Sequence, residues 1–396
     1  MANPSPDGLR RAVLDAAPGP LHPVAAQTLA AAIEAGWADP RRLHGEGRTA
    51  RRLLDDSRAV LADGLGVRPE EVTFAPDGPT AVRWMARGLS YAARRRGARV
   101  VTSAVEHSAV LLPARHEAAL SGDPALAGVV PVDRLGRVDL ERWSREVSVD
   151  GTVAALLQHA NGEVGTVQPL AAARDACRSA GVPLGVDAQA SLGRVAPPQE
   201  YDVLAGDAQS WGGPGGLGVL VVPERTRWLL PGPADPDAAL HGPSRHTPWV
   251  PLALAAAEAW QQTAVTRTAD AAEAHRLVDE LRAAAARVAD VEVVGDPTER
   301  LPHVVTFSAL YADGEALVRE FDRRGFAVSS GSACTSSTLE PSHVLAAMGA
   351  LTHGNTRVTL PLAAVSPTRA DDVRAFADHV APAVASVRAE LGADHL

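Results

Sequence analysis

The sequence predicts an α/β protein in which a large domain with a mostly parallel central sheet is joined to a smaller α+β domain. Apolar runs rich in valine and leucine alternate with alanine-rich stretches as far as residue 222. Such alternation is typical of βα units whose sheet is covered on both faces. A long alanine-rich helix is expected at 251–288, and short strands and helices follow it. The chain of 396 residues is long enough to bury two cores.

The large domain is expected to span residues 20–255. Its predicted strands are the apolar runs at 98–104, 126–132, 151–158, 182–188 and 216–222. The stretch GDAQSWGGPGGLGVL, at 206–220, has the form of a strand that enters a glycine-rich turn and continues into a second strand.

The smaller domain is expected to consist of residues 256–396 together with the N-terminal segment 1–19. Its predicted strands lie near 291–294, 303–308 and 326–329, and its predicted helices near 314–324 and 368–390. Short strands that are mixed with helices in this way indicate an α+β arrangement.

Charge and hydropathy exclude several classes of function. The formal net charge is −9, and no basic stripe stands against it, so a nucleic-acid partner is not expected. The N-terminus lacks the features of a signal peptide, and no window approaches the length of a membrane span. We therefore expect a cytoplasmic protein with no membrane partner.

The two cysteines, Cys177 and Cys334, cannot form a disulfide framework. Cys177 lies in RDACRSAGVPL, an alanine-rich helical stretch before a predicted core strand, where a cysteine is usually buried packing. Cys334 lies in SSGSACTSSTLEPSHVL, residues 329–345, whose small polar residues favour a loop that presents a thiol. The alternative for Cys334 is a cysteine in a tight turn.

The chain contains no lysine, because all 38 of its Lys and Arg residues are arginine. It therefore has no side-chain primary amine with which to form a Schiff base.

From LDAAPGPLHP at 14–23 to GNTRVTLPL at 354–362, the sequence resembles the cysteine desulfurases, which are class V aminotransferases. The resemblance implies the fold-type-I PLP-transferase architecture and a homodimer whose sites borrow residues across the interface. It also implies pyridoxal phosphate (PLP) bound to a lysine. In this family the loop cysteine, here Cys334, takes sulfur from free cysteine as a persulfide and leaves alanine.

The resemblance assigns roles to four residues that match the family's motifs. His107 in AVEHSAVL would stack on the pyridine ring, and Asp187 in VDAQASLGR would pair with the ring nitrogen. Arg357 and Asn161 would bind the substrate, and Arg357 would grip the substrate's carboxylate. Taken alone, His107 could be a helix-start residue and Asp187 a carboxylate at a strand end. Gly162 stands where an asparagine is common in the family.

The sequence departs from the family where the cofactor is attached. Ser210 occupies the position of the imine-forming lysine, and Gln209 replaces its histidine neighbour. Around the phosphate, Pro79 removes an amide donor, and Asp207 replaces a serine that binds the phosphate. A carboxylate about 4 Å from a phosphate costs roughly 4 kcal/mol per pair of unit charges at an effective dielectric near 20. Thr247 still resembles the threonine that the partner subunit supplies.

These observations predict a desulfurase-like protein of sulfur metabolism that accepts or relays persulfide sulfur at Cys334 without ordinary PLP imine catalysis. PLP is expected from the family but is not expected to be bound covalently, and no metal is expected. Two alternatives stay open. The chain could be a noncatalytic pseudoenzyme that binds a genuine desulfurase or another sulfur donor or acceptor protein. It could instead be a PLP-independent enzyme that reuses His107, Asp187, Gln189 and Arg357.

Overall fold

The computed structural model describes residues 11–17, 19–36, 38–120, 122–232, 246–331 and 341–393. Seven of the described strands form one sheet in the order β2-β8-β7-β6-β5-β3-β4. Their bounds are β2 Val72–Ala75, β3 Arg99–Ser103, β4 Ala127–Val130, β5 Thr152–Gln158, β6 Leu184–Asp187, β7 Val203–Asp207 and β8 Gly218–Val221.

The large sheet is mostly parallel, as the sequence predicts. Strands β4, β3, β5, β6 and β7 pair in parallel. Strand β8 is antiparallel to both β7 and β2, so β2 runs in the same direction as the parallel strands. The carboxyl ends of β2, β3, β5, β6 and β7 therefore lie at one edge of the sheet.

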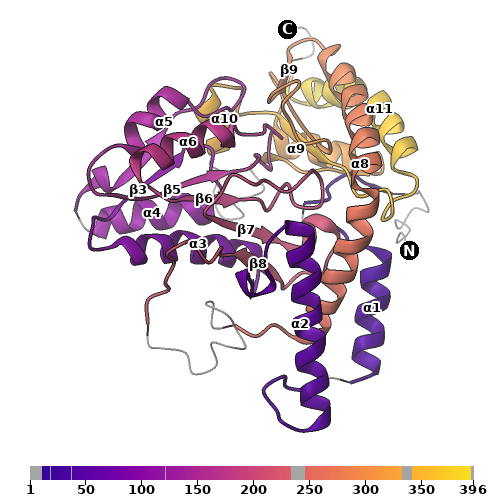
Figure 1. Ribbon diagram of the computed structural model, residues 1–396. Helices are drawn as coiled ribbons and strands as arrows, with labels where there is room; N and C mark the ends of the chain where they lie inside the picture. The colour runs from indigo at the N-terminus through magenta and orange to yellow at the C-terminus, as the bar shows by residue number, and fades with distance from the viewer. Residues whose placement is uncertain are drawn as a thin grey trace.

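Helices cover both faces of this sheet (Figure 1). Helices α3 (Gly78–Ala93) and α4 (Ser108–Leu120) lie on one face, and α5 (Leu140–Val147) and α6 (Leu170–Ala180) lie on the other. In β5, Ala154 and Leu156 pack on the α3 side, whereas Ala155 and Leu157 pack on the α6 side. Because both faces are buried, this strand reads as an unbroken apolar run.

The smaller domain has its own sheet, in which β10 (Val304–Ala309) pairs antiparallel with β9 (Val291–Val294) and β12 (Asn355–Thr359). Near the chain start, β1 (Ala12–Val13) pairs in parallel with β11 (Phe326–Ala327). The helices of this region are α9 (Gly314–Arg323), α10 (His343–Met348) and α11 (Arg369–Glu390).

Helix α8 (Val250–Ala286) links the two parts of the molecule. Its residues up to Trp260 belong to the core of the large sheet, and its residues from Ala274 onward belong to the core of the smaller one. Helices α1 (Pro23–Glu34) and α2 (Gly45–Leu65) pack against α8. The two cores support a domain division within α8, and the boundary at 255/256 stays a proposal.

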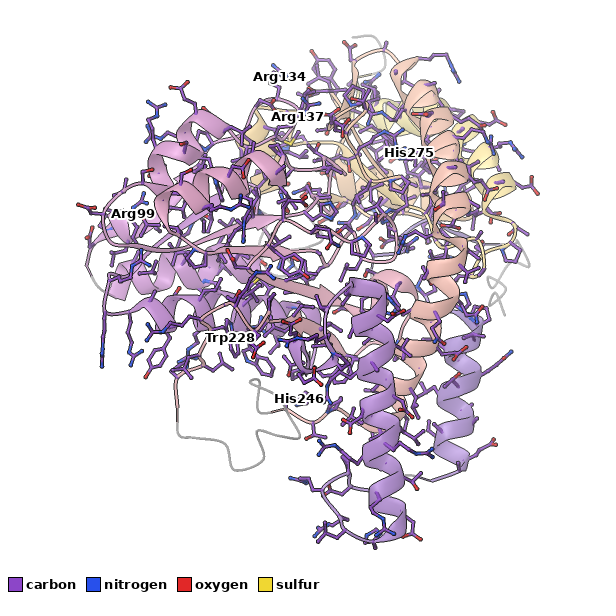
Figure 2. The ribbon with its side chains drawn as sticks, in the orientation of Figure 1. Arg99, Arg134, Arg137, Trp228, His246 and His275 are labelled. Carbon is purple, nitrogen blue, oxygen red and sulfur yellow. The ribbon has the colours of Figure 1, made fainter. Side chains whose placement is uncertain are left out.

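Ion pairs also join the two parts. Arg134 lies 3.1 Å from Glu292, and Arg137 pairs with the buried Asp296. Figure 2 labels both arginines, which extend from the large domain toward the strands of the smaller one. None of the described helices is both long enough and apolar enough to cross a membrane.

Candidate functional site

The residues that the sequence singles out gather at the carboxyl edge of the large sheet. His107 follows β3, Asn161 follows β5, Asp187 ends β6 and Asp207 ends β7. In open α/β sheets this edge is where ligands bind. These residues form two groups, the ring end (His107, Asp187 and Gln189) and the phosphate end (Gly78, Asp207 and Ser210).

At the ring end, Asp187 is 5% exposed and is held by Gln189. The Gln189 backbone N–H donates to Asp187 Oδ1 at 2.9 Å, and the Gln189 side-chain amide donates to Oδ2 at 2.9 Å. Burial raises the pKa of Asp187, and the nearby His107 opposes that rise. The structure therefore brings these three residues together.

His107 is exposed and lies just before α4. Its Nδ1 accepts a hydrogen bond from the Ala109 backbone N–H at 3.1 Å. The ring thus takes part in the helix start, which was the simpler of the two interpretations of this residue. Because the ring is exposed and close to Asp187, it remains accessible to a ligand at the same edge.

Glu106 is a buried acid beside this group that the sequence analysis missed. Ser103 Oγ donates to Glu106 Oε1 at 2.5 Å, whereas Oε2 has no hydrogen-bond partner among the described residues. Burial raises the pKa of Glu106 to about 8, and the nearby Asp187 adds to the rise. The only sequence signal is a glutamate directly before His107, and nothing in the local pattern predicts its complete burial.

At the phosphate end, the chain's own carboxylates bind the start of α3. The Gly78 N–H donates to Asp207 Oδ2 at 2.7 Å, and the Thr80 N–H donates to Asp77 Oδ1 at 2.6 Å. Pro79, between them, has no N–H to donate. The second oxygen of Asp207 accepts from the Gln209 N–H at 2.9 Å. Neither of these N–H groups is left for a phosphate.

Ser210 and Gln209 lie in the short helical turn Ala208–Trp211 that follows β7. The Ser210 hydroxyl donates to the Asp207 carbonyl oxygen at 2.8 Å, and Arg194 Nε donates to the Ser210 carbonyl at 2.8 Å. The Ser210 hydroxyl is therefore bound to the backbone of the preceding strand, and the Ser210 carbonyl is bound to a buried arginine. The side-chain amide of Gln209 lies against Gly215.

Arg357 lies on β12 and is 6% exposed. Its guanidinium is 3.7 Å from Asp15 Oδ1 and also interacts with Glu163, a second buried acid. Burial raises the pKa of both carboxyl groups, and Arg357 opposes each rise. The arginine predicted to grip a substrate carboxylate is thus flanked by two carboxyl groups of the chain.

Asn161 uses its whole side chain to hold a turn. Its oxygen accepts from the N–H groups of Glu163 (2.8 Å) and Val164 (2.9 Å), and its nitrogen donates to the Val105 carbonyl (3.0 Å). With 3% exposure, Asn161 shapes the turn that carries Glu163. A contact between its amide and a substrate would need one of these bonds to break.

Cys334 lies outside the described residues, and the structure places only the ends of its loop. Ser329 exchanges backbone hydrogen bonds with Arg357, at 3.1 and 2.7 Å, and the Gly331 N–H donates to Asn355 Oδ1. On the other side of Cys334, the Ser342 hydroxyl at the start of α10 bonds to Glu163. The described residues on either side of Cys334 are therefore close to Arg357 or Glu163.

Cys177 is completely buried in α6, as predicted. Burial raises the pKa of its thiol to about 12, which leaves almost no thiolate at neutral pH.

Thr247 lies just before α8. Its hydroxyl oxygen is buried and has no hydrogen-bond partner within the described ranges. Its neighbour His246, labelled in Figure 2, contacts the edge of Trp84 in α3, with ring centroids 6.3 Å apart. The described residues contain no cluster of three or more side chains that could hold a metal ion.

The chain is similar to known proteins over most of its length. The family model described as aminotransferase class-V matches residues 13–366. A cysteine desulfurase of Cereibacter sphaeroides is 32% identical over 337 residues, which cover 83% of this chain and 84% of that protein. Cysteine desulfurase IscS 1 of Archaeoglobus fulgidus is 30% identical over 332 residues, covering 82% and 84%.

Solved structures agree on the fold. A NifS-like protein superposes with a TM-score of 0.81 at 22% identity, over 93% of this chain and 99% of that one. DndA from Streptomyces lividans superposes with a TM-score of 0.70 at 25% identity, over 85% and 95%.

Proposed function

This chain belongs to the aminotransferase class-V family, and on that premise we propose that it is a cysteine desulfurase-like protein that accepts or relays persulfide sulfur at Cys334. The observation that carries the proposal is Ser210 at the position of the family's lysine, in a chain with no lysine. The Cys334 loop keeps its small polar sequence, and its ends lie close to Arg357 and Glu163.

The family depends on PLP, and this chain's residues fit only part of that cofactor. The ring end retains a buried carboxylate and an exposed imidazole. The phosphate end has its N–H donors bound to Asp77 and Asp207, and no amine exists for covalent attachment. We infer that PLP is not held covalently, and the proposed chemistry includes no step that uses it.

Sulfur acceptance at Cys334 requires only thiol chemistry. The Cys334 thiolate attacks the outer sulfur of a donor persulfide, and a new S–S bond forms as the donor's S–S bond breaks. The donor leaves as a thiolate, and Cys334 becomes the persulfide, so no external oxidant or reductant is needed. The donor is a persulfide on another protein or on a small thiol.

Free cysteine is not the proposed sulfur source. A serine hydroxyl at position 210 can neither form the imine with PLP nor transfer the proton at Cα, and release of sulfur from free cysteine depends on both in this family. The Ser210 hydroxyl also donates its hydrogen bond to the Asp207 carbonyl.

A second candidate is a noncatalytic pseudoenzyme that binds or regulates a genuine desulfurase. The internal use of Asp207, Ser210 and Asn161 favours it, because these side chains bind the chain's own backbone. A third, a PLP-independent enzyme that reuses the ring end, is favoured by the accessible His107 beside Asp187. Under each candidate we propose a cytoplasmic homodimer.

Mass spectrometry of transferred sulfur tests the leading proposal. The protein is mixed with a desulfurase carrying isotopically labelled persulfide, and wild type is compared with Cys334→Ala and Cys177→Ala. We expect label on Cys334 in wild type and in Cys177→Ala, and none in Cys334→Ala. The absence of label on either cysteine, with a stable complex still formed, would favour the noncatalytic partner.

A further inference from the structure

The first turn of α3 has a limited supply of hydrogen-bond donors. The N–H groups at the start of a helix have no partners within that helix and form the usual binding site for anions. In α3 the Ala81 N–H already bonds to the Asp77 carbonyl at 3.0 Å, and Pro79 contributes no N–H. Gly78 and Thr80 supply the remaining donors of this turn.

Both donors are bound to carboxylates of the chain itself. Asp77 Oδ1 accepts from Thr80 at 2.6 Å, which is an ordinary helix cap. Asp207 Oδ2 accepts from Gly78 at 2.7 Å, although Asp207 lies 129 residues further along the chain. Its other oxygen accepts from the Gln209 N–H at 2.9 Å. The Asp207 carboxylate therefore joins the start of α3 to the turn after β7.

The fit between these segments depends on the absence of a side chain at Gly78. A Cβ there would lie 2.6 Å from Asp207 Cβ and 2.7 Å from Asp207 Oδ2. It would also lie 2.5 Å from Gln189 Oε1, so the ring end meets the phosphate end at this glycine. Gly78, Pro79 and Asp207 thus act together to close the helix start.

We propose that Asp207 is an internal substitute for a phosphate and determines ligand specificity: it fills the anion position of α3 and makes this site reject phosphate esters. Ligands that lack a phosphate keep access to the ring end, where His107 is exposed. In a relative that binds the cofactor, its phosphate would join the helix to the sheet, whereas here the carboxylate joins them without a ligand.

The surrounding charge acts in the same direction. Burial raises the pKa of Asp207, and the nearby Asp77 and Asp187 add to that rise. A phosphate dianion entering this space would meet these carboxylates and find the Gly78 and Thr80 donors already bonded. Rejection therefore has a steric, a hydrogen-bonding and an electrostatic cause.

This inference deepens the proposed function by naming what stands in place of the cofactor's phosphate. Its test measures the selectivity of ligand binding and involves no sulfur transfer, so either proposal can fail alone. The probes are pyridoxine and pyridoxine 5′-phosphate, which differ only in the phosphate. Neither carries an aldehyde, so neither can react with an amine.

Calorimetric titration of the full chain compares wild type with Asp207→Ser and Asp207→Asn. We expect wild type to bind the phosphate ester no more tightly than pyridoxine. Asp207→Ser frees the Gly78 N–H, and the phosphate ester should gain about tenfold or more in affinity relative to pyridoxine. Asp207→Asn keeps an oxygen for Gly78 but removes the charge, so a smaller gain in the same direction is expected.

Asp139→Ser is the matched control, because Asp139 also caps a helix, accepting from the Arg142 N–H at 2.9 Å. It should bind both compounds as wild type does. Tenfold tighter binding of the phosphate ester by wild type would overturn the proposal. So would an unchanged affinity ratio in both Asp207 variants, or no binding of the phosphate ester to either variant. If Asp207→Ser does not fold, Asp207→Asn alone decides.

Discussion

The ring end and the phosphate end lie at the same edge of one sheet, yet they use their carboxylates in opposite ways. Among the described residues, the Asp187 carboxylate bonds to its near neighbour Gln189 and lies near the exposed His107. Asp207 bonds to the backbone of a distant helix and closes it. Burial raises the pKa of both acids, so the difference lies in their partners and not in their depth.

This difference separates the two ends by what their polar groups are free to bind. Contacts that would hold a ring nitrogen need a single carboxylate, and that carboxylate is present. Contacts that would hold a phosphate need free N–H donors, and here those donors are bonded to carboxylates of the chain itself. The predictions below separate the two ends, beginning with the largest expected effect.

Freeing the donors of the phosphate end and adding a lysine at position 210 should let both ends bind the cofactor. The triple variant Asp207→Ser, Gln209→His, Ser210→Lys opens the Gly78 N–H and supplies an amine. With added PLP, we expect it to gain the visible absorbance band of a lysine-bound cofactor, whereas wild type shows none. The Gln209→His single variant is the control and should also show none. Equal bands in wild type and the triple variant would contradict the assignment of position 210.

At the ring end, Glu106→Gln should change how stability depends on pH. The pKa of about 8 in the folded state lies above the ordinary value of 4.5, so between these values the folded protein holds a proton that the unfolded chain has lost. Wild type should therefore lose up to about 5 kcal/mol as pH rises through this window, and Glu106→Gln should lose less. Chemical denaturation at pH 5 and pH 9 measures the effect, and parallel profiles for the two proteins would exclude it.

Asp207→Ser should destabilise the protein by about 1–3 kcal/mol, because the Gly78 and Gln209 N–H groups lose their acceptor. Asp207→Asn should cost less, since it retains an oxygen. Asp139→Ser, which replaces one helix-capping residue with another, should change stability little. Denaturant midpoints measured without ligand provide the comparison, and an Asp207→Ser protein as stable as wild type would argue against the structural role of this carboxylate.

His107→Ala should have the smallest effect on stability, within about 1 kcal/mol, because the exposed ring makes one local hydrogen bond at the start of α4. Thermal unfolding compared with Asp207→Ser measures it. If His107→Ala lost as much stability as Asp207→Ser, the two ends would contribute equally to the stability of the fold.

The sequence predicted the apolar elements of the fold more fully than the contacts of the site. The apolar run at 151–158 matches β5, and the long helix expected at 251–288 matches α8. Strand β2 was missed because its four residues follow a short turn with no apolar run before them. Strand β12 was missed because NTRVT carries polar residues, although all five residues are buried in the fold.

The site divides in the same way. Motif resemblance was sufficient to propose His107, Asp187 and Arg357, and the structure brings the first two together. The bond between Gly78 and Asp207 joins residues far apart in the chain, so no local pattern reveals it. The burial of Glu106 and Glu163, and the pairing of Arg357 with Asp15, likewise depend on packing between separate elements.

We propose that this chain receives sulfur as persulfide and does not extract it from cysteine. The most direct measurement follows the mass of the Cys334 peptide under two conditions: labelled cysteine with added PLP, and a labelled persulfide donor without PLP. The account predicts added sulfur only with the persulfide donor, and no alanine above a control with free PLP alone. Added sulfur on Cys334 from cysteine and PLP, together with released alanine, would contradict it.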